Sequence, residues 1–291
     1  MNKPRIAFLG LGLMGSGMAH RLVGAGFPVA VYNRNRDKAA PFAAAGATVA
    51  ASPREAAMSA NVILSMVSDD VAARTVWLGE HGALAAATAG TVCVESSTVT
   101  VGWVRELATA AAARGCEFLD APVTGSRTHA AAGELNFLVG GSEATLEKVR
   151  PALAVMSKTI TLLGPVGSGA LIKLINNFVC GVQIAALAEA LGMIESSGLN
   201  RDRALEVLTN GAPGSPLVKA IGARMTAADY TPHFLLRLMA KDLKYAIEEG
   251  GRLSIKSATA AAALERFQEG IASGLGEKDI AALVELFRQR G

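Results

Sequence analysis

The chain has 291 residues, of which 51% are hydrophobic and 18% are charged. This length is sufficient for two domains with substantial cores, and the composition is typical of a globular protein. The formal net charge of +3 is small, and no stripe of Lys and Arg with interleaved aromatic residues occurs, which argues against nucleic acid as a partner.

The first predicted element is a strand over 5–9, which runs directly into a glycine-rich loop and a helix over 16–25. The loop consists of Gly10, Leu11, Gly12, Leu13, Met14 and Gly15. In a dinucleotide site the first glycine permits a sharp turn, the second a close approach to a pyrophosphate, and the third tight packing of the helix on the strand. A second strand over 27–32 completes a βαβ unit. The alternative, a secretory signal peptide starting near Lys3, is disfavoured because the three glycines would interrupt its apolar helix.

The end of the second predicted strand indicates which dinucleotide binds. In NAD-binding units an Asp or Glu at this place accepts hydrogen bonds from the adenosine ribose, whereas this chain has Asn33 and Arg34. The Arg34 guanidinium can bind the 2′-phosphate of NADP and stack on adenine, so the sequence favours NADP(H) over NAD(H). The alternative is that Arg34 and Arg36 are ordinary solvated loop charges.

Up to about residue 164, short apolar runs alternate with Ala-rich amphipathic stretches. This pattern predicts an α/β fold with a Rossmann-type doubly wound sheet. Further strands are expected at 62–66, 91–95, 117–120, 135–139 and 159–163. Because fewer helices separate the last of them, we expect one or more antiparallel strands at that end of the sheet.

The composition changes at the Gly-rich and Pro-rich segment 164–169, after which helical periodicity continues to the C-terminus. We therefore predict an NADP-binding Rossmann domain over 1–164 and an all-helical substrate and dimerisation domain over 165–291. Helices are expected at 170–196, 202–209, 217–225, 235–250, 255–270 and 277–289. The first is apolar on most faces, which predicts burial in a homodimer or homotetramer. Its apolar core at 174–187 is short and contains polar residues, so we expect no membrane span.

Cysteine and histidine spacing predicts neither a disulfide nor a metal site. Cys93, Cys116 and Cys180 are far apart in apolar segments, which is typical of buried free thiols in a reducing compartment. The four histidines share no ligand-like spacing. We expect a cytoplasmic protein without a bound metal.

The candidate for acid–base chemistry is Lys173, in an apolar turn near the start of the first helix of the second domain. Desolvation in such a turn destabilises the ammonium and prepares it for proton transfer near neutral pH. Asn177 lies four residues further on, so both side chains emerge from one face and can hold the same substrate oxygen. The alternative is a lysine that reaches the surface beside packed asparagines, and the spacing alone does not decide between the two.

Five motifs in this order give the chain a specific resemblance to the β-hydroxyacid dehydrogenase family over almost its whole length. They are the glycine loop and the segments 95–98, 120–126, 167–177 and 241–243. The resemblance implies hydride transfer between nicotinamide and the carbonyl carbon of a short aldehyde acid, with Lys173 protonating the alkoxide and Asn177 orienting the oxygen.

The same resemblance implies the remaining contacts. The cofactor contacts are the glycine loop, Met66, Val67, Thr98 and Lys241, and the substrate contacts are Thr124, Gly125, Ser126, Phe234, Lys173 and Asn177. On local pattern alone, Thr98 is more typical of a strand-end cap, Lys241 of a solvated helix charge and Phe234 of a core residue.

Details of the motifs bear on the substrate. The segment 124–126 and Arg34 are closer to the NADPH-dependent glyoxylate and succinic semialdehyde reductases of the family, whereas 127–129 departs from their pattern and leaves the substrate open. Three alternatives remain: an NAD-dependent 3-hydroxyisobutyrate-type dehydrogenase, an imine reductase, and a non-catalytic NADP-binding scaffold. The presence of Lys173 argues against the imine reductase, and Lys173 with Asn177 argues against the scaffold.

Overall fold

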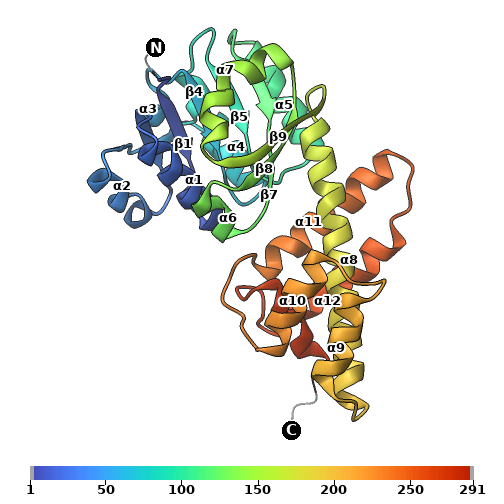
Figure 1. Ribbon diagram of the computed structural model, residues 1–291. Helices are drawn as coiled ribbons and strands as arrows, with labels where there is room; N and C mark the ends of the chain where they lie inside the picture. Colours follow the sequence, from blue (N-terminus) through green and yellow to red (C-terminus); the bar gives the residue numbers. More distant parts are fainter. Residues whose placement is uncertain (1–2, 289–291) are drawn as a thin grey trace. The chain divides into compact units, whose positions relative to one another are not determined.

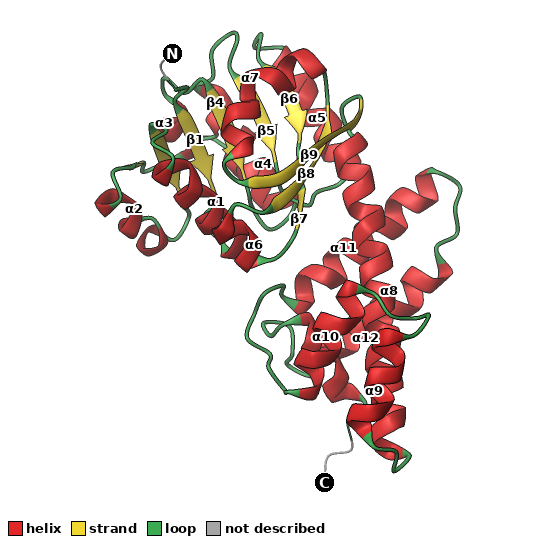
Figure 2. Cartoon of the chain, in the orientation of Figure 1, coloured by secondary structure: helices red, strands yellow, loops and turns green. Residues whose placement is uncertain are grey.

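The computed structural model describes residues 3–288. The chain divides into two compact units, Met1–Lys173 and Leu174–Gly291 (Figure 1). The first combines strands and helices, and the second is helical apart from an isolated bridge between Leu235 and Asp279 (Figure 2). The predicted α/β sheet followed by a helical region is thereby confirmed.

The first unit is built on one twisted sheet. Its strands are β1 (Ile6–Leu9), β2 (Val29–Tyr32), β3 (Thr48–Val49), β4 (Val62–Ser65), β5 (Val92–Glu95), β6 (Glu117–Asp120), β7 (Val123–Thr124), β8 (Leu135–Gly140) and β9 (Ser157–Gly164). The order is β3-β2-β1-β4-β5-β6-β8-β7, with β9 paired to β8. The strands from β3 to β6 are parallel, and β8 runs antiparallel to β6 and β7, so the expected antiparallel end of the sheet is confirmed.

The register of the parallel strands aligns the places where they end. Leu9 pairs with Tyr32 and with Ser65, Ser65 with Glu95, and Glu95 with Asp120. Each of these residues is the last of its strand. The loops that follow them therefore emerge at one edge of the sheet, which is where ligands bind in open parallel α/β sheets.

Helices alternate with the strands of this unit. They are α1 (Leu13–Gly24), α2 (Ala40–Ala44), α3 (Pro53–Ala57), α4 (Asp70–Leu78), α5 (Val101–Ala112), α6 (Arg127–Ala132) and α7 (Glu143–Ala154), with 3₁₀ turns η1 (Arg36–Lys38) and η2 (Ala83–Ala85). Strands β1, β4 and β5 are buried along their whole length, as expected for parallel strands covered on both faces. The sequence missed β3 and β7 because two residues are too few to show a periodic pattern.

The second unit has its own hydrophobic core. Its helices are α8 (Ser168–Ser196), which begins in the first unit, α9 (Arg201–Asn210), α10 (Pro216–Thr226), α11 (Leu236–Arg252) and α12 (Ala258–Ala272), with the 3₁₀ segment η3 (Ile280–Leu286). Side chains from α8 to η3 form one buried apolar cluster. Of the helix predicted over 277–289, residues 280–286 are helical but form a 3₁₀ helix, of which residues 280–284 are buried. Residue 289 lies outside the described residues.

Helix α8 is longer than the apolar run from which it was predicted. By length and composition it could cross a membrane, with a mean hydropathy of 1.6 over its most apolar window. However, 39% of that window is buried inside the structure, and a buried core helix satisfies the same criteria. The helix is therefore weak support for a membrane span.

Candidate active site

The glycine loop has the backbone geometry that its sequence predicted. Gly10 has φ +102°, a conformation that side chains rarely adopt. A Cβ on Gly15 would overlap the carbonyl oxygen of Gly10 and approach the Phe8 ring to 3.2 Å. The first glycine is thus needed for the turn, and the third for the packing of α1 on β1.

The middle glycine is needed for no contact within the protein. Gly12 is exposed, and a Cβ there would meet no protein atom within 4 Å. It is also the N-cap of α1, with no side-chain cap, and the first turn of the helix carries no acidic residue. Uncapped amides at a helix N-terminus and an open approach to the backbone fit the pyrophosphate of a dinucleotide.

The end of β2 is tied to the glycine loop. The Asn33 side-chain oxygen accepts a hydrogen bond from the Leu11 N–H at 2.9 Å, and its amide group donates to the Asn35 carbonyl at 2.8 Å. Asn33 therefore fixes the loop, a role that the sequence did not predict. Arg34, the next residue, is exposed, so its guanidinium is accessible to a ligand.

The loops after β4 and β5 are joined to each other and to the glycine loop. The Val67 N–H donates to the Ser97 hydroxyl at 2.8 Å. A Cβ on Gly10 would overlap the carbonyl oxygen of Met66. Met66, Val67 and Thr98 are each partly exposed, so the structure brings these three predicted cofactor contacts to the same edge as the glycine loop.

The predicted substrate loop lies between β7 and α6. Thr124 is in β7, Gly125 has φ +122° and Ser126 is the N-cap of α6. The Ser126 hydroxyl lies 2.8 Å from His129 Nδ1, and the Ser126 N–H donates to the same nitrogen at 3.1 Å. The sequence did not predict this role of His129, although the Ser-x-x-His spacing of a helix cap could have indicated it.

Lys173 is in the second turn of α8, a helix whose start is held by Asp120. The Asp120 carboxylate accepts hydrogen bonds from the Gly167 N–H at 2.7 Å and the Ala170 N–H at 2.8 Å. Burial raises the pKa of Asp120, and these amide donors act in the opposite direction. The sequence could not reveal this link, because Asp120 and Gly167 are 47 residues apart.

The desolvation expected for Lys173 in its apolar turn is incomplete, since the residue is partly exposed. Its long side chain is nevertheless suited to carry an ammonium group to a substrate oxygen.

In the second unit, Asn177 and Lys241 are joined through Asp242. Asn177 is 3% exposed, and its side-chain amide donates to Asp242 Oδ2 at 2.6 Å. The Lys241 ammonium lies 2.9 Å from the other carboxylate oxygen. The Asn177 side-chain oxygen accepts a hydrogen bond from Asn176 at 2.9 Å. The sequence predicted roles for Asn177 and Lys241 but none for Asp242, the buried carboxylate between them.

Phe234 is partly buried and packs against the core of the helical unit. Its N–H donates to Asp279 at 2.9 Å, as does that of His233 at 2.8 Å, and Arg224 forms an ion pair with the same carboxylate at 2.7 Å. A buried ion pair therefore fixes the loop that carries Phe234.

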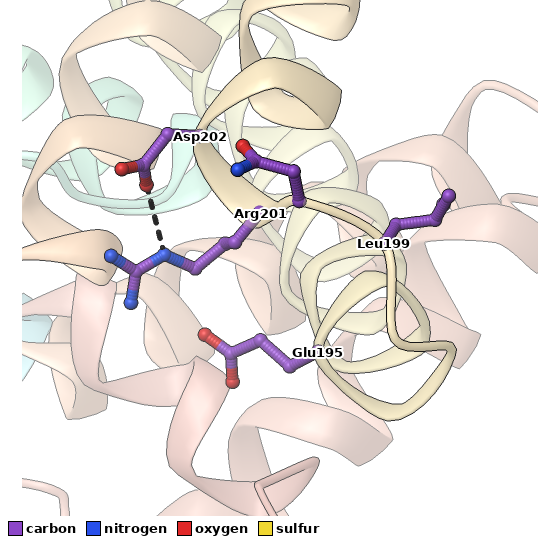
Figure 3. Close-up of a pocket in the computed structure, with 5 residues that line it drawn as sticks. Glu195, Leu199, Arg201 and Asp202 are labelled. Carbon is purple, nitrogen blue, oxygen red and sulfur yellow. Dashed lines mark hydrogen bonds and ion pairs between the residues drawn. The ribbon is translucent and has the colours of Figure 1, made fainter.

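A surface hollow of about 270 Å³ in the helical unit contains none of the predicted site residues. Its lining is Glu195, Leu199, Asn200, Arg201 and Asp202 (Figure 3). The charges there are already paired, Arg201 with Asp202 at 3.1 Å and Glu195 with Arg288 at 2.9 Å. Over residues 3–288, no three His, Cys, Asp or Glu side chains are grouped to hold a metal. Within the same residues no disulfide links Cys93, Cys116 and Cys180, and Cys180 is only partly buried.

Comparison with known protein families gives two matches that together span most of the chain. Residues 5–164 match the NAD-binding domain of 6-phosphogluconate dehydrogenase. Residues 167–287 match the NAD-binding region of NADP-dependent 3-hydroxyisobutyrate dehydrogenase. Both descriptions indicate a pyridine nucleotide as the cofactor.

Individual relatives are similar along nearly their full length. Glyoxylate/succinic semialdehyde reductase 1 of Arabidopsis thaliana is 35% identical over 280 residues, which cover 96% of this chain and 97% of the relative. NAD-dependent L-serine dehydrogenase of Pseudomonas aeruginosa is 33% identical, with 97% of each chain covered. The structure of Mycobacterium tuberculosis 3-hydroxyisobutyrate dehydrogenase with L-serine has a TM-score of 0.89 at 33% identity, covering 99% of this chain and 100% of that one.

Proposed function

Since the chain belongs to the β-hydroxyacid dehydrogenase family and is an NAD(P)-dependent enzyme that acts on CH–OH groups, we propose that it uses NADPH to reduce a short aldehyde acid to its hydroxyacid. The observation that carries the proposal is the α8 sequence, which has Lys173 and Asn177 one helical turn apart. The glyoxylate/succinic semialdehyde reductase named above supports this substrate class.

The first 164 residues are assigned to nucleotide binding. The uncapped α1 N-terminus at Gly12 and the glycine loop hold the pyrophosphate, and Met66, Val67 and Thr98 line the same edge of the sheet. Arg34 binds the 2′-phosphate, since no carboxylate stands at the end of β2 to compete for a ribose hydroxyl. Asn33 keeps the glycine loop in place.

Residues 165–291 are assigned to the chemistry and to self-association. When bound, the reduced nicotinamide supplies a hydride to the carbonyl carbon. Lys173 gives a proton to the oxygen as negative charge develops on it, and Asn177, held by Asp242, orients that oxygen. Lys241 serves the nicotinamide end of the nucleotide, and Phe234 contributes an apolar contact to the substrate.

The loop of Thr124, Gly125 and Ser126 binds the carboxylate of the substrate. Backbone N–H groups and hydroxyls in a turn favour anions, and the positive φ of Gly125 gives the loop such a turn. This assignment predicts that the enzyme prefers aldehyde acids to simple aldehydes.

The test is NADPH consumption with glyoxylate, succinic semialdehyde, methylmalonate semialdehyde and a cyclic imine, together with oxidation of L-serine and 3-hydroxyisobutyrate. At least one aldehyde acid should be reduced efficiently. Lys173→Ala should lower kcat by about 10²- to 10⁴-fold, the usual contribution of a general acid.

Lys158→Ala is the matched control, because Lys158 is exposed and belongs to β9. It should retain wild-type turnover. Failure to reduce any aldehyde acid would refute the substrate class, and undiminished turnover in Lys173→Ala would refute the role of the lysine.

A further inference from the structure

Glu95 is a buried carboxyl group that the proposed chemistry does not use. It is the last residue of β5 and has no exposed surface. Its Oε1 accepts a hydrogen bond from the Ser97 N–H at 2.9 Å, and its Oε2 accepts one from the Trp77 indole N–H at 2.9 Å. Burying a carboxyl group is costly unless it makes hydrogen bonds, and these two contacts offset that cost. The presence of a carboxyl group at this buried place is what needs an explanation.

The hydrogen bonds of Glu95 lead to both loops that follow the central strands. Through Ser97 N–H it fixes the backbone just before Thr98, in the loop after β5. The Ser97 hydroxyl in turn accepts a hydrogen bond from the Val67 N–H at 2.8 Å, in the loop after β4. The Trp77 indole N–H also donates to the Ser65 hydroxyl at 2.9 Å, and this contact fixes the end of β4.

The loop after β4, which belongs to this network, also packs against the glycine loop. Gly10 is so close to Met66 that a Cβ would overlap the Met66 carbonyl oxygen, and it would lie 2.9 Å from Val67 Cγ1. A shift of the loop after β4 would therefore press on the turn that begins the pyrophosphate site. Hydrogen bonds and close packing thus connect Glu95 to the two loops and to the glycine loop.

We propose that Glu95 is a positioning residue for the nicotinamide cofactor, which it serves by fixing the backbone at Val67 and Ser97. The proposal rests on the assignment of Met66, Val67 and Thr98 to nucleotide binding. Glu95 itself is buried and does not touch the nucleotide.

Glu95→Gln tests this role with a side chain of nearly the same shape. A carboxyl group can accept hydrogen bonds on both oxygens, whereas an amide can accept on one only. The NH₂ group of glutamine must then face either the Ser97 N–H or the Trp77 N–H. Two facing donors repel, so the side chain is displaced and its hold on the Ser97 backbone is weakened in either orientation.

Nucleotide binding is measured by titration calorimetry, and turnover is measured at saturating nucleotide. Glu95→Gln should raise the Kd of NADPH and that of NADH by the same factor, about tenfold or more, as expected for the loss of a buried hydrogen bond. The KM for the aldehyde acid should stay within about twofold of the wild-type value, since the substrate loop is not part of this network.

A second variant distinguishes the loss of loop positioning from general destabilisation of the fold. In Glu95→Gln with Trp77→Phe, the amide oxygen can accept from Ser97 while the NH₂ group donates to the Ser65 hydroxyl, so the conflict with the indole disappears. The Kd values should return to within about threefold of wild type although a second buried residue has been changed.

Leu146→Ala is the stability control, because Leu146 is fully buried in α7 of the same unit and its backbone N–H donates to Ser142, outside the hydrogen bonds of Glu95. It should lower the melting temperature and leave the nucleotide Kd unchanged. The proposal is overturned if Glu95→Gln binds both nucleotides as tightly as the wild type, or if the double variant binds no better than Glu95→Gln. A wild type that prefers NADH would refute the NADPH assignment alone, because Glu95 affects both nucleotides equally.

Discussion

The side chain expected to discriminate between the two nucleotides is Arg34, which is exposed immediately after β2. Arg34→Ala removes a guanidinium that can bind the 2′-phosphate in a bidentate manner. The Kd of NADPH should rise about tenfold or more, while the Kd of NADH should change by less than about twofold. Titration of wild type and variant with both nucleotides measures the effect.

Arg36→Ala is the control for Arg34→Ala. Arg36 is also exposed but lies two residues further on, in η1. Its loss should have a smaller effect on NADPH than the loss of Arg34. Equal affinities of the wild type for NADH and NADPH, or equal weakening of both by Arg34→Ala, would contradict the assignment.

Single residues were predictable from the sequence where their role depends on local backbone. The turn at Gly10 and the close packing at Gly15 follow from a motif of six residues. Asp120 and Asp242 lie in segments that the sequence singled out, but their roles were not predictable, because their partners lie far away in the chain. Asp120 bonds to Gly167, 47 residues away, and Asp242 to Asn177, 65 residues away. One sequence alone does not show which residues far apart in the chain form such contacts.

At the scale of elements, the start of α8 is a tightly constrained join in the first unit. A Cβ on Gly169 would overlap the Leu138 carbonyl oxygen and lie 3.0 Å from the Asp120 carboxylate. Gly169→Ala should push the helix away from β6 and β8, with a loss of about 1–3 kcal/mol in unfolding free energy. It should also lower kcat, because Lys173 is one turn further along the helix. Denaturant unfolding and steady-state kinetics measure the two effects.

Gly24→Ala is the matched control for Gly169→Ala. Gly24 also belongs to a helix, α1, and a Cβ there would meet no atom within 4 Å. This change should leave kcat unaltered and stabilise the protein by up to about 1 kcal/mol, because alanine loses less backbone entropy than glycine on folding. A Gly169→Ala protein with native stability and kcat would show that the join is not tight.

The elements themselves were largely predictable, for reasons that also explain the failures. Strands such as β4 and β5 are short apolar runs that end in one polar residue, and their boundaries lie within a residue of the prediction. Strands β3 and β7 have two residues each, which is too short for a pattern. The segment of η3 is apolar enough for a helix, but Asp279 is bonded to Arg224 and to the loop at His233, so tertiary contacts determine its path.

At the scale of the whole molecule, α8 exposes apolar side chains along one face. Ile175 is 43%, Val179 47% and Met193 74% exposed. Residues four and eighteen positions apart return to nearly the same angle at about 3.6 residues per turn, so the three share a face. Light scattering should therefore show a dimer or tetramer, because such a face is stabilised by burial against another copy.

Val179→Lys should shift this equilibrium towards smaller species by placing a charge in the proposed contact. Val71→Lys is the control, since Val71 is more exposed, at 76%, but belongs to α4 in the other unit. A wild-type monomer at working concentration would contradict the expectation, as would dissociation of both variants to the same extent.

The environment of Trp77 has a spectroscopic consequence. The chain contains two tryptophans, Trp77 and Trp103, and both are buried in the unit that ends at Lys173. Intrinsic tryptophan fluorescence therefore reports on that unit, and the helices beyond it unfold without a tryptophan of their own to signal the change. Paired with far-ultraviolet circular dichroism, to which the helices of both units contribute, the same sample distinguishes one cooperative transition from two.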